Sequence, residues 1–297
     1  MELPSEAEVA SYLADSNWGR WGADDQRGAI NLITPEKRVA AARLVQSGRS
    51  VSLARPYPKT PAANNLNPAQ HFMRIMPNGV AVDYYGISYH GTSSTHLDAM
   101  CHMWNDEGMW NGRSPDTLTT EGATWGSIEH WSTGITTRGV LLDVERHRGT
   151  YVTEATPVHG WELEEIAKAQ GVTMEPGDAL IVNCGRESFE RDHGVWGTTR
   201  EHRPGLHASC LPFIRKNDVS VLIWDMLDHM PAGYSAVSSG GVHPALYRFG
   251  VGLVDNAQLD RVAAACAEEG RYEFMLTMAP LIVQGGTGSP INPLAVF

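Results

Sequence analysis

The sequence predicts an α/β protein with a central mixed or barrel-like sheet flanked by helices. Three observations lead to this fold class. Short apolar runs typical of strands recur along the chain, and segments with helical periodicity fall between several of them. The 297 residues with 42% hydrophobic content are enough to bury a large core. No internal repeat or low-complexity linker divides the chain, so we expect one domain over residues 1–297, with residues 1–50 as a helical extension packed on it.

The expected elements follow the chain in order. A helix is predicted over residues 6–14, and a second over 34–46 begins with a Thr34-Pro35 cap and ends before Gly48. Two later helices are predicted over residues 161–170 and 256–269. Strands are predicted over residues 50–54, 86–90, 139–144, 179–183, 219–224 and 274–280.

Composition excludes several function classes. The net charge is −11, from 34 acidic and 23 basic residues, whereas nucleic acids and anionic membranes bind basic patches. The acidic start of the chain lacks a secretion signal, and no apolar run approaches the ~20 residues that span a bilayer. We therefore expect a cytoplasmic protein with a small-molecule substrate, and no nucleic-acid or membrane partner. A Gly-x-Ser-x-Gly elbow, a dinucleotide fingerprint and a Walker A sequence are all missing from the sequence.

The most informative segment reads HGTSSTHLDAMCH over residues 90–102. It places three imidazoles and one carboxylate within thirteen positions, a mixed set that suits zinc or manganese in a site open to water. In a strand, His96 and Asp98 would project from one face about 6.5 Å apart. His102 joins them only if the chain turns, and a helical turn starting at Asp98 would achieve this. The alternative is a histidine-rich loop with ordinary hydrogen bonds.

Residues 95–102, THLDAMCH, resemble the His-x-Gly-Thr-His-x-Asp-x-Pro-x-His signature of the putative cyclase family. That family includes kynurenine formamidase, isatin hydrolase and a dienelactone hydrolase. The resemblance implies a swivelling β/α/β-type fold, one or two zinc or manganese ions, and assembly as a homodimer or homotetramer. It also implies that His96 and Asp98 bind metal and that His102 acts as the catalytic acid and base.

The match departs from the signature at three positions. The first family histidine corresponds to Thr92, the glycine to Ser94 and the proline to Met100. His90 precedes His96 by six residues, and a backbone bulge at Gly91 would let it replace the missing ligand. We expect His90 to be a metal ligand. Cys101 lies inside the motif, but we expect it to be neither ligand nor nucleophile.

A second part of the resemblance lies near the end of the chain. His243 and Asp255 keep the twelve-residue spacing of a histidine and a glutamate that bind metal in two-zinc members. Aspartate is one methylene shorter, so a single ion is one alternative. Another is that Asp255 only caps the helix that follows it.

Three functional hypotheses remain open. The first is a metal-dependent amidohydrolase or lactonase that cleaves a C–N or C–O bond of a small cyclic or aryl amide, imide or lactone through metal-bound hydroxide. The second is a metal-dependent cyclase or dehydratase acting on an enolisable, polyketide-like substrate. The third is a degenerate member that binds metal without catalysis. The candidate residues for a substrate pocket are Trp104, Tyr84, Trp196 and His207.

Overall fold

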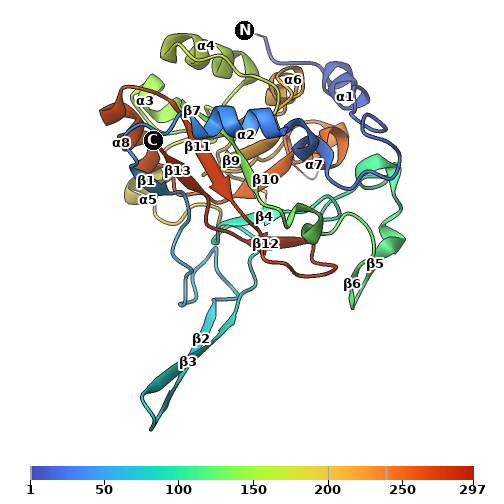
Figure 1. Cartoon of the computed structure of the whole chain (residues 1–297). Helices are drawn as coiled ribbons and strands as arrows, with labels where there is room; N and C mark the ends of the chain where they lie inside the picture. Colours follow the sequence, from blue (N-terminus) through green and yellow to red (C-terminus); the bar gives the residue numbers. More distant parts are fainter. Residues whose placement is uncertain (1, 200, 238–239) are drawn as a thin grey trace.

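The structure is a computed structural model that describes residues 2–199, 201–237 and 240–297. Its centre is a nine-stranded mixed sheet curled into a half-barrel (Figure 1). Parallel pairing joins four central strands, and antiparallel pairing adds the strands on both sides. In spatial order the strands are β1 (Ser50–Ser52), β13 (Leu294–Val296), β11 (Glu273–Met278), β7 (Ile135–Asp143), β8 (Ala179–Asn183), β9 (Val221–Trp224), β10 (Gly252–Asp255), β4 (His96–Asp98) and β12 (Gly288–Pro290).

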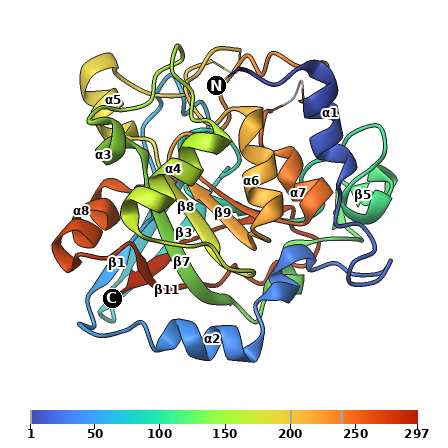
Figure 2. The same ribbon diagram turned by 90° about the horizontal axis from the view of Figure 1, so that it is seen from above.

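Helices surround this sheet, as the view from above shows (Figure 2). Helix α2 packs against β7 and β11, α4 against β7 and α6, and α8 against β1. The described helices are α1 (Glu6–Ala14), α2 (Pro35–Ala42), α3 (Val144–Arg148), α4 (Gly160–Gln170), α5 (Arg186–His193), α6 (Leu211–Lys216), α7 (Pro244–Phe249) and α8 (Asp260–Glu269). One cluster of buried apolar side chains extends from Val9 to Ala295 and Phe297. The predicted α/β fold, with a mixed or barrel-like sheet flanked by helices, is confirmed.

Local chemistry explains where the predicted helices begin and end. Helix α1 has the predicted bounds, and its first turn is closed by a capping box between Ser5 and Glu8. Helix α2 begins after the predicted Thr34 cap but ends at Ala42, because the chain then tightens into turns that pair each N–H with the carbonyl three residues back. Helix α8 begins four residues later than predicted, at Asp260.

The predicted strand over residues 86–90 is wrong. These residues follow a hairpin of β2 (Gln70–Met76) and β3 (Val80–Gly86), and the strand ends at Gly86. A three-residue loop joins the two strands, with Gly79 in the left-handed conformation (φ 82°) that such loops favour. The hairpin extends away from the rest of the molecule (Figure 1). A smaller hairpin pairs β5 (Leu118–Thr119) with β6 (Gly122–Ala123).

The short strand β4 lies between β10 and β12 and pairs antiparallel with both. It carries the centre of the motif found in the sequence, so the motif is fixed by main-chain hydrogen bonds on both sides. Among the described residues, no helix is both long and apolar enough to cross a bilayer.

Candidate metal centre

The predicted ligands come together where β4 pairs with β10. His96 and Asp98 lie at the two ends of β4, and residues two apart in a strand point to the same face. Asp255 ends β10 directly opposite His96 in the antiparallel register. Opposed residues share a face, so the three buried side chains converge.

Asp98 is the hub of the cluster. Its Oδ1 lies 3.1 Å from Nδ1 of His90, 3.5 Å from Nε2 of His96 and 3.8 Å from Nε2 of His102. The carboxylate is fully buried, and neither oxygen has a hydrogen-bond partner among the residues that the structure describes. Burial would raise the pKa of Asp98, but the three imidazoles outweigh it and hold the pKa well below its usual range.

Buried carboxylate oxygens that accept no hydrogen bond require an explanation, because a charge in the interior is costly unless it is paired. Two sets of donor atoms converge on Asp98, one with His90 and His102 and one with His96 and Asp255. Within each set the donor atoms lie within 4.8 Å of one another. Imidazole nitrogen and carboxylate oxygen are the donors that zinc and manganese accept, so these residues fit a divalent cation.

His90 reaches the centre from an irregular segment, not from a strand. Gly91 has φ 140°, which supplies the backbone bend expected from the sequence. The His90 ring stacks on His102 with centroids 4.0 Å apart, and its Nε2 lies 3.1 Å from Oγ1 of Thr287. The hydroxyl of Thr92 instead donates to the Gly197 carbonyl at 3.0 Å. His90, and not Thr92, therefore brings a side chain to Asp98.

A tight turn, and not a helix, brings His102 to Asp98. The main-chain N–H of His102 donates to the carbonyl of Ala99 at 2.9 Å, and the residues that follow are irregular. The predicted helical start at Asp98 is wrong because Asp98 is the last residue of β4. Burial lowers the pKa of His102 to about 4, although Asp98 opposes the shift. The ring is therefore neutral at pH 7 and able to accept a proton.

His243 enters the cluster from the start of α7 and contacts two carboxylates. Its Nδ1 bonds to Oδ2 of Asp228, and its Nε2 lies 3.4 Å from Oδ2 of Asp255. Asp228 also accepts the main-chain N–H groups of Val242 (2.6 Å) and His243 (3.1 Å). Burial alone would lower the pKa of His243, but the two carboxylates raise it well above its usual value. Asp228 was not predicted as a site residue, and the one local feature that marks it is its place in the irregular segment after β9.

Asp255 does not cap a helix. Its Oδ1 accepts a hydrogen bond of 2.6 Å from Nε1 of Trp224, and its Oδ2 faces His96 at 3.8 Å. The next helix begins at Asp260, with Leu259 at the cap position. Both Asp255 oxygens are therefore directed toward the cluster and its support, and the capping alternative is wrong.

A cavity of about 540 Å³ opens over the cluster. Its apolar walls come from Met103, Leu227 and Met230, and Arg203 contributes a cation that also bonds through Nε to the Asp228 carbonyl at 3.0 Å. The rest of the lining is mainly polar, so the cavity offers a small apolar surface beside the candidate ligands.

The four side chains predicted to form the pocket do not line this cavity in the described part of the chain. Tyr84 lies on the hairpin and is 58% exposed, and Trp104 is 46% exposed outside the cavity. Trp196 is buried and donates to the Pro204 carbonyl. His207 caps a short 3₁₀ turn, where its Nδ1 accepts from the N–H of Ser209. Each has a structural partner or a place at the surface, and none of the four lines the cavity over the cluster.

Cys101 is buried beside the motif with its Sγ directed at the Gly286 carbonyl. Burial raises the pKa of its thiol to about 12, so it is protonated at neutral pH and suited neither to bind metal nor to attack.

Comparisons with known proteins identify the family and the fold. A family model described as putative cyclase matches residues 40–229. The crystal structure of a novel cyclase is 32% identical, with a TM-score of 0.82 over 95% of this chain and 99% of that one. An isatin hydrolase bound to the product analogue thioisatinate is 12% identical, with a TM-score of 0.60 over 89% of this chain and 99% of that one.

A predicted metal-dependent hydrolase from Bacillus stearothermophilus is 16% identical, with a TM-score of 0.50 over 83% of this chain and 97% of that one. The comparison with curated proteins gave no significant match. The family model spans more than half of the chain, and the resemblance found in the motif is confirmed. The chain therefore belongs to the putative cyclase family.

Proposed function

We propose that this protein is a metal-dependent hydrolase that cleaves a C–N or C–O bond of a small cyclic or aryl amide, imide or lactone. The observation that carries the proposal is Asp98, a buried carboxylate with no hydrogen-bond donor among three imidazoles. The named isatin hydrolase and metal-dependent hydrolase of similar fold support the reaction class.

The proposed ligands of one or two zinc or manganese ions are His90, His96, Asp98, His243 and Asp255. In such a site a divalent ion polarises the substrate carbonyl and makes bound water more acidic. Nδ1 of His96 donates a hydrogen bond to the Ser94 carbonyl at 2.8 Å, which leaves the lone pair of Nε2 directed toward the cluster. Asp228 orients His243 through a hydrogen bond with Nδ1, and Nε2 of His243 is directed at Asp255.

His102 is the proposed acid and base. Its pKa of about 4 keeps the ring neutral, and the ring lines the cavity. Nε2 accepts the proton of the attacking water as the new C–O bond forms. The same proton then passes to the leaving nitrogen or oxygen as the old bond breaks, so the ring ends neutral. Met103, Leu227 and Met230 give an apolar substrate a surface to pack against.

A substrate screen in heavy-oxygen water tests the reaction. We expect lactones, imides or aryl amides to be opened with one labelled oxygen in the product, because hydrolysis inserts an oxygen from water. The variant His102→Gln should keep its metal and lose about 10²- to 10⁴-fold in kcat. A product without label would contradict hydrolysis and favour ring closure or dehydration.

We also propose that the protein is a homo-oligomer, with a second copy covering the β2–β3 hairpin. A lone two-stranded hairpin is marginally stable in water. One face of this hairpin exposes Phe72, Val82 and Tyr84, and the other exposes Met73 and Ile75. Analytical ultracentrifugation should give a dimer or tetramer at micromolar concentration, and Ile75→Lys should shift it toward monomer. A monomeric wild type would contradict this proposal.

A further inference from the structure

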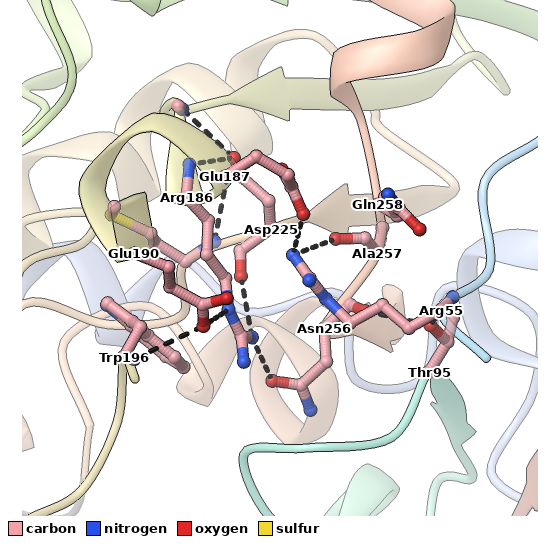
Figure 3. Close-up of polar contacts among 12 residues, drawn as sticks. Arg55, Thr95, Arg186, Glu187, Glu190, Trp196, Asp225, Asn256, Ala257 and Gln258 are labelled. Carbon is pink, nitrogen blue, oxygen red and sulfur yellow. Dashed lines mark hydrogen bonds and ion pairs between the residues drawn. The ribbon is translucent and has the colours of Figure 1, made fainter. Parts of the chain in front are cut away.

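The loop between His90 and His96 is held by side chains from elsewhere in the fold. Two of these side chains, Arg186 and Asn256, also bond to each other (Figure 3). Nδ2 of Asn256 donates to the carbonyl of Gly91 at 2.8 Å and to the carbonyl of Ser94 at 3.2 Å. The Ser94 carbonyl is the same one that accepts from His96 Nδ1. The Asn256 amide and the proposed ligand His96 therefore bond to the same carbonyl oxygen.

Arg186, the first residue of α5, holds both the loop and this amide. Its Nη2 donates to the Thr92 carbonyl at 2.8 Å, and its Nη1 donates to Oδ1 of Asn256 at 3.0 Å. A guanidinium only donates, so it accepts the amide in one orientation, with Oδ1 toward Arg186 and Nδ2 toward the loop carbonyls. The two side chains thus fix three carbonyls in the segment of residues 91–94.

The rest of the network makes Arg186 rigid. Its Nε pairs with Glu190 at 2.9 Å, and its guanidinium lies 4.5 Å from the centre of the Trp196 ring. Asp225 accepts the main-chain N–H of Arg186 at 3.0 Å and so anchors the start of α5 (Figure 3). The Arg186 side chain is only 2% exposed. A buried cation is costly for a fold, so its use to hold a loop beside the metal centre suggests a role there.

Asn256 has a backbone conformation that suits this position. It follows Asp255 and has φ 56°, in the left-handed region that asparagine tolerates better than most residues. Strand β10 directs Asp255 toward the cluster, and the left-handed bend that follows lets the Asn256 side chain reach the loop. Two consecutive residues therefore have different roles. Asp255 is a proposed ligand, and Asn256 supports the loop between two others, His90 and His96.

We propose that Asn256 and Arg186 are positioning residues that hold the 91–94 loop so that His90 and His96 face Asp98. The inference rests on the proposed metal site but concerns residues that do not bind the ion. Partners behind metal ligands typically contribute 10- to 100-fold in metal affinity.

Metal titration of purified apo-protein tests the positioning role of Asn256 and Arg186. The variants are Asn256→Gly, which tolerates the positive φ, and Arg186→Gln. The control is Arg138→Gln on β7, which removes another largely buried arginine whose ion pairs go to Asp178 and Glu273. Each protein is titrated with Mn²⁺ at a temperature well below its Tm, and Tm is measured without metal.

We expect the Kd for Mn²⁺ to rise about 10- to 100-fold in Asn256→Gly and Arg186→Gln. In Arg138→Gln we expect a lower Tm with a Kd within twofold of wild type. If Arg186→Gln does not fold, Asn256→Gly carries the test, because it leaves the buried charge and its other partners in place. If Asn256→Gly has a wild-type Kd and only a lower Tm, Asn256 has a merely structural role. That result would overturn the proposed positioning role and leave the proposed function standing. A wild-type protein that binds neither Mn²⁺ nor Zn²⁺ would overturn both the proposed function and the proposed positioning role.

Discussion

Histidines gather at two places in this molecule, and only one of them has the chemistry of a metal site. The centre at Asp98 joins imidazoles to a buried carboxylate without donors. The second histidine cluster consists of His159, His207 and His229, whose ring centroids lie 4.6 and 6.4 Å apart from one ring to the next.

Two of the three rings in the second histidine cluster bond to hydroxyl and backbone groups. His159 bonds through Nδ1 to the Ser209 hydroxyl at 3.1 Å, and His207 bonds through Nε2 to the Tyr234 hydroxyl at 3.3 Å. Within the described residues, donor atoms converge to form a candidate ion site only around Asp98. The difference shows that close histidines do not identify a metal site by themselves. At Asp98 the added feature that indicates an ion is a buried carboxylate without hydrogen-bond donors surrounded by imidazoles.

The largest expected effect separates the two clusters directly. His90→Ala should lose most of its bound metal, because it removes the nearest imidazole to Asp98. His207→Ala should keep wild-type metal content, because its ring bonds only to neutral partners. Thr92→Val is a second control inside the motif, since its hydroxyl donates to Gly197 and not to the centre. Mass spectrometry of metal content checks all three. Equal metal in His90→Ala and wild type would remove His90 from the ligand set.

A smaller effect is expected one step behind the ligands. Asp228→Asn should weaken metal binding about 10- to 100-fold while keeping the fold, because the amide retains the shape but loses the charge that holds His243. Competition with a fluorescent zinc chelator measures the change. Unchanged affinity would mean that His243 is oriented without Asp228.

The smallest effect concerns pH and belongs to the second histidine cluster. Burial lowers the pKa of His207 to about 4, below its unfolded value of 6.5. The unfolded chain therefore binds more protons, so the stability from neutral His207 is present above pH 6.5 and is lost as pH falls toward 4. His207→Gln should reduce the pH dependence of the unfolding free energy in this window. The upper limit is about 1.4 kcal/mol per pH unit, the value for one proton, and partial solvent contact will make it smaller. Urea titrations from pH 4 to 7 measure it, and an unchanged slope would contradict the assignment.

Local sequence signals predicted much of the fold. Strand β8 and helix α1 have the predicted bounds, because a run of four apolar residues and a capping box are local features. The β2–β3 hairpin was missed although Asn78-Gly79 lies between two apolar runs, a known hairpin signal. The strand assigned to residues 86–90 was wrong because periodicity does not show where a chain leaves its partner strand.

The site was predicted where spacing reports on geometry and missed where it does not. His96 and Asp98 lie two apart in a strand, so their shared face follows from the sequence. Asp228 and Arg186 act through contacts between segments far apart in the chain, and nothing local marks them. The aromatic pocket candidates lie away from the cavity over the cluster because aromatic side chains more often fill cores or lie at the surface, as the buried Trp196 illustrates.

The central claim is that Asp98 and its imidazoles form a divalent metal site. The most direct test is the metal content of protein purified without chelators, comparing wild type with Asp98→Asn, which keeps the shape of the side chain and removes its charge. We predict near-stoichiometric zinc or manganese in the wild type and only background metal in a folded Asp98→Asn. A folded wild type that contains no metal and takes up neither zinc nor manganese would contradict the claim.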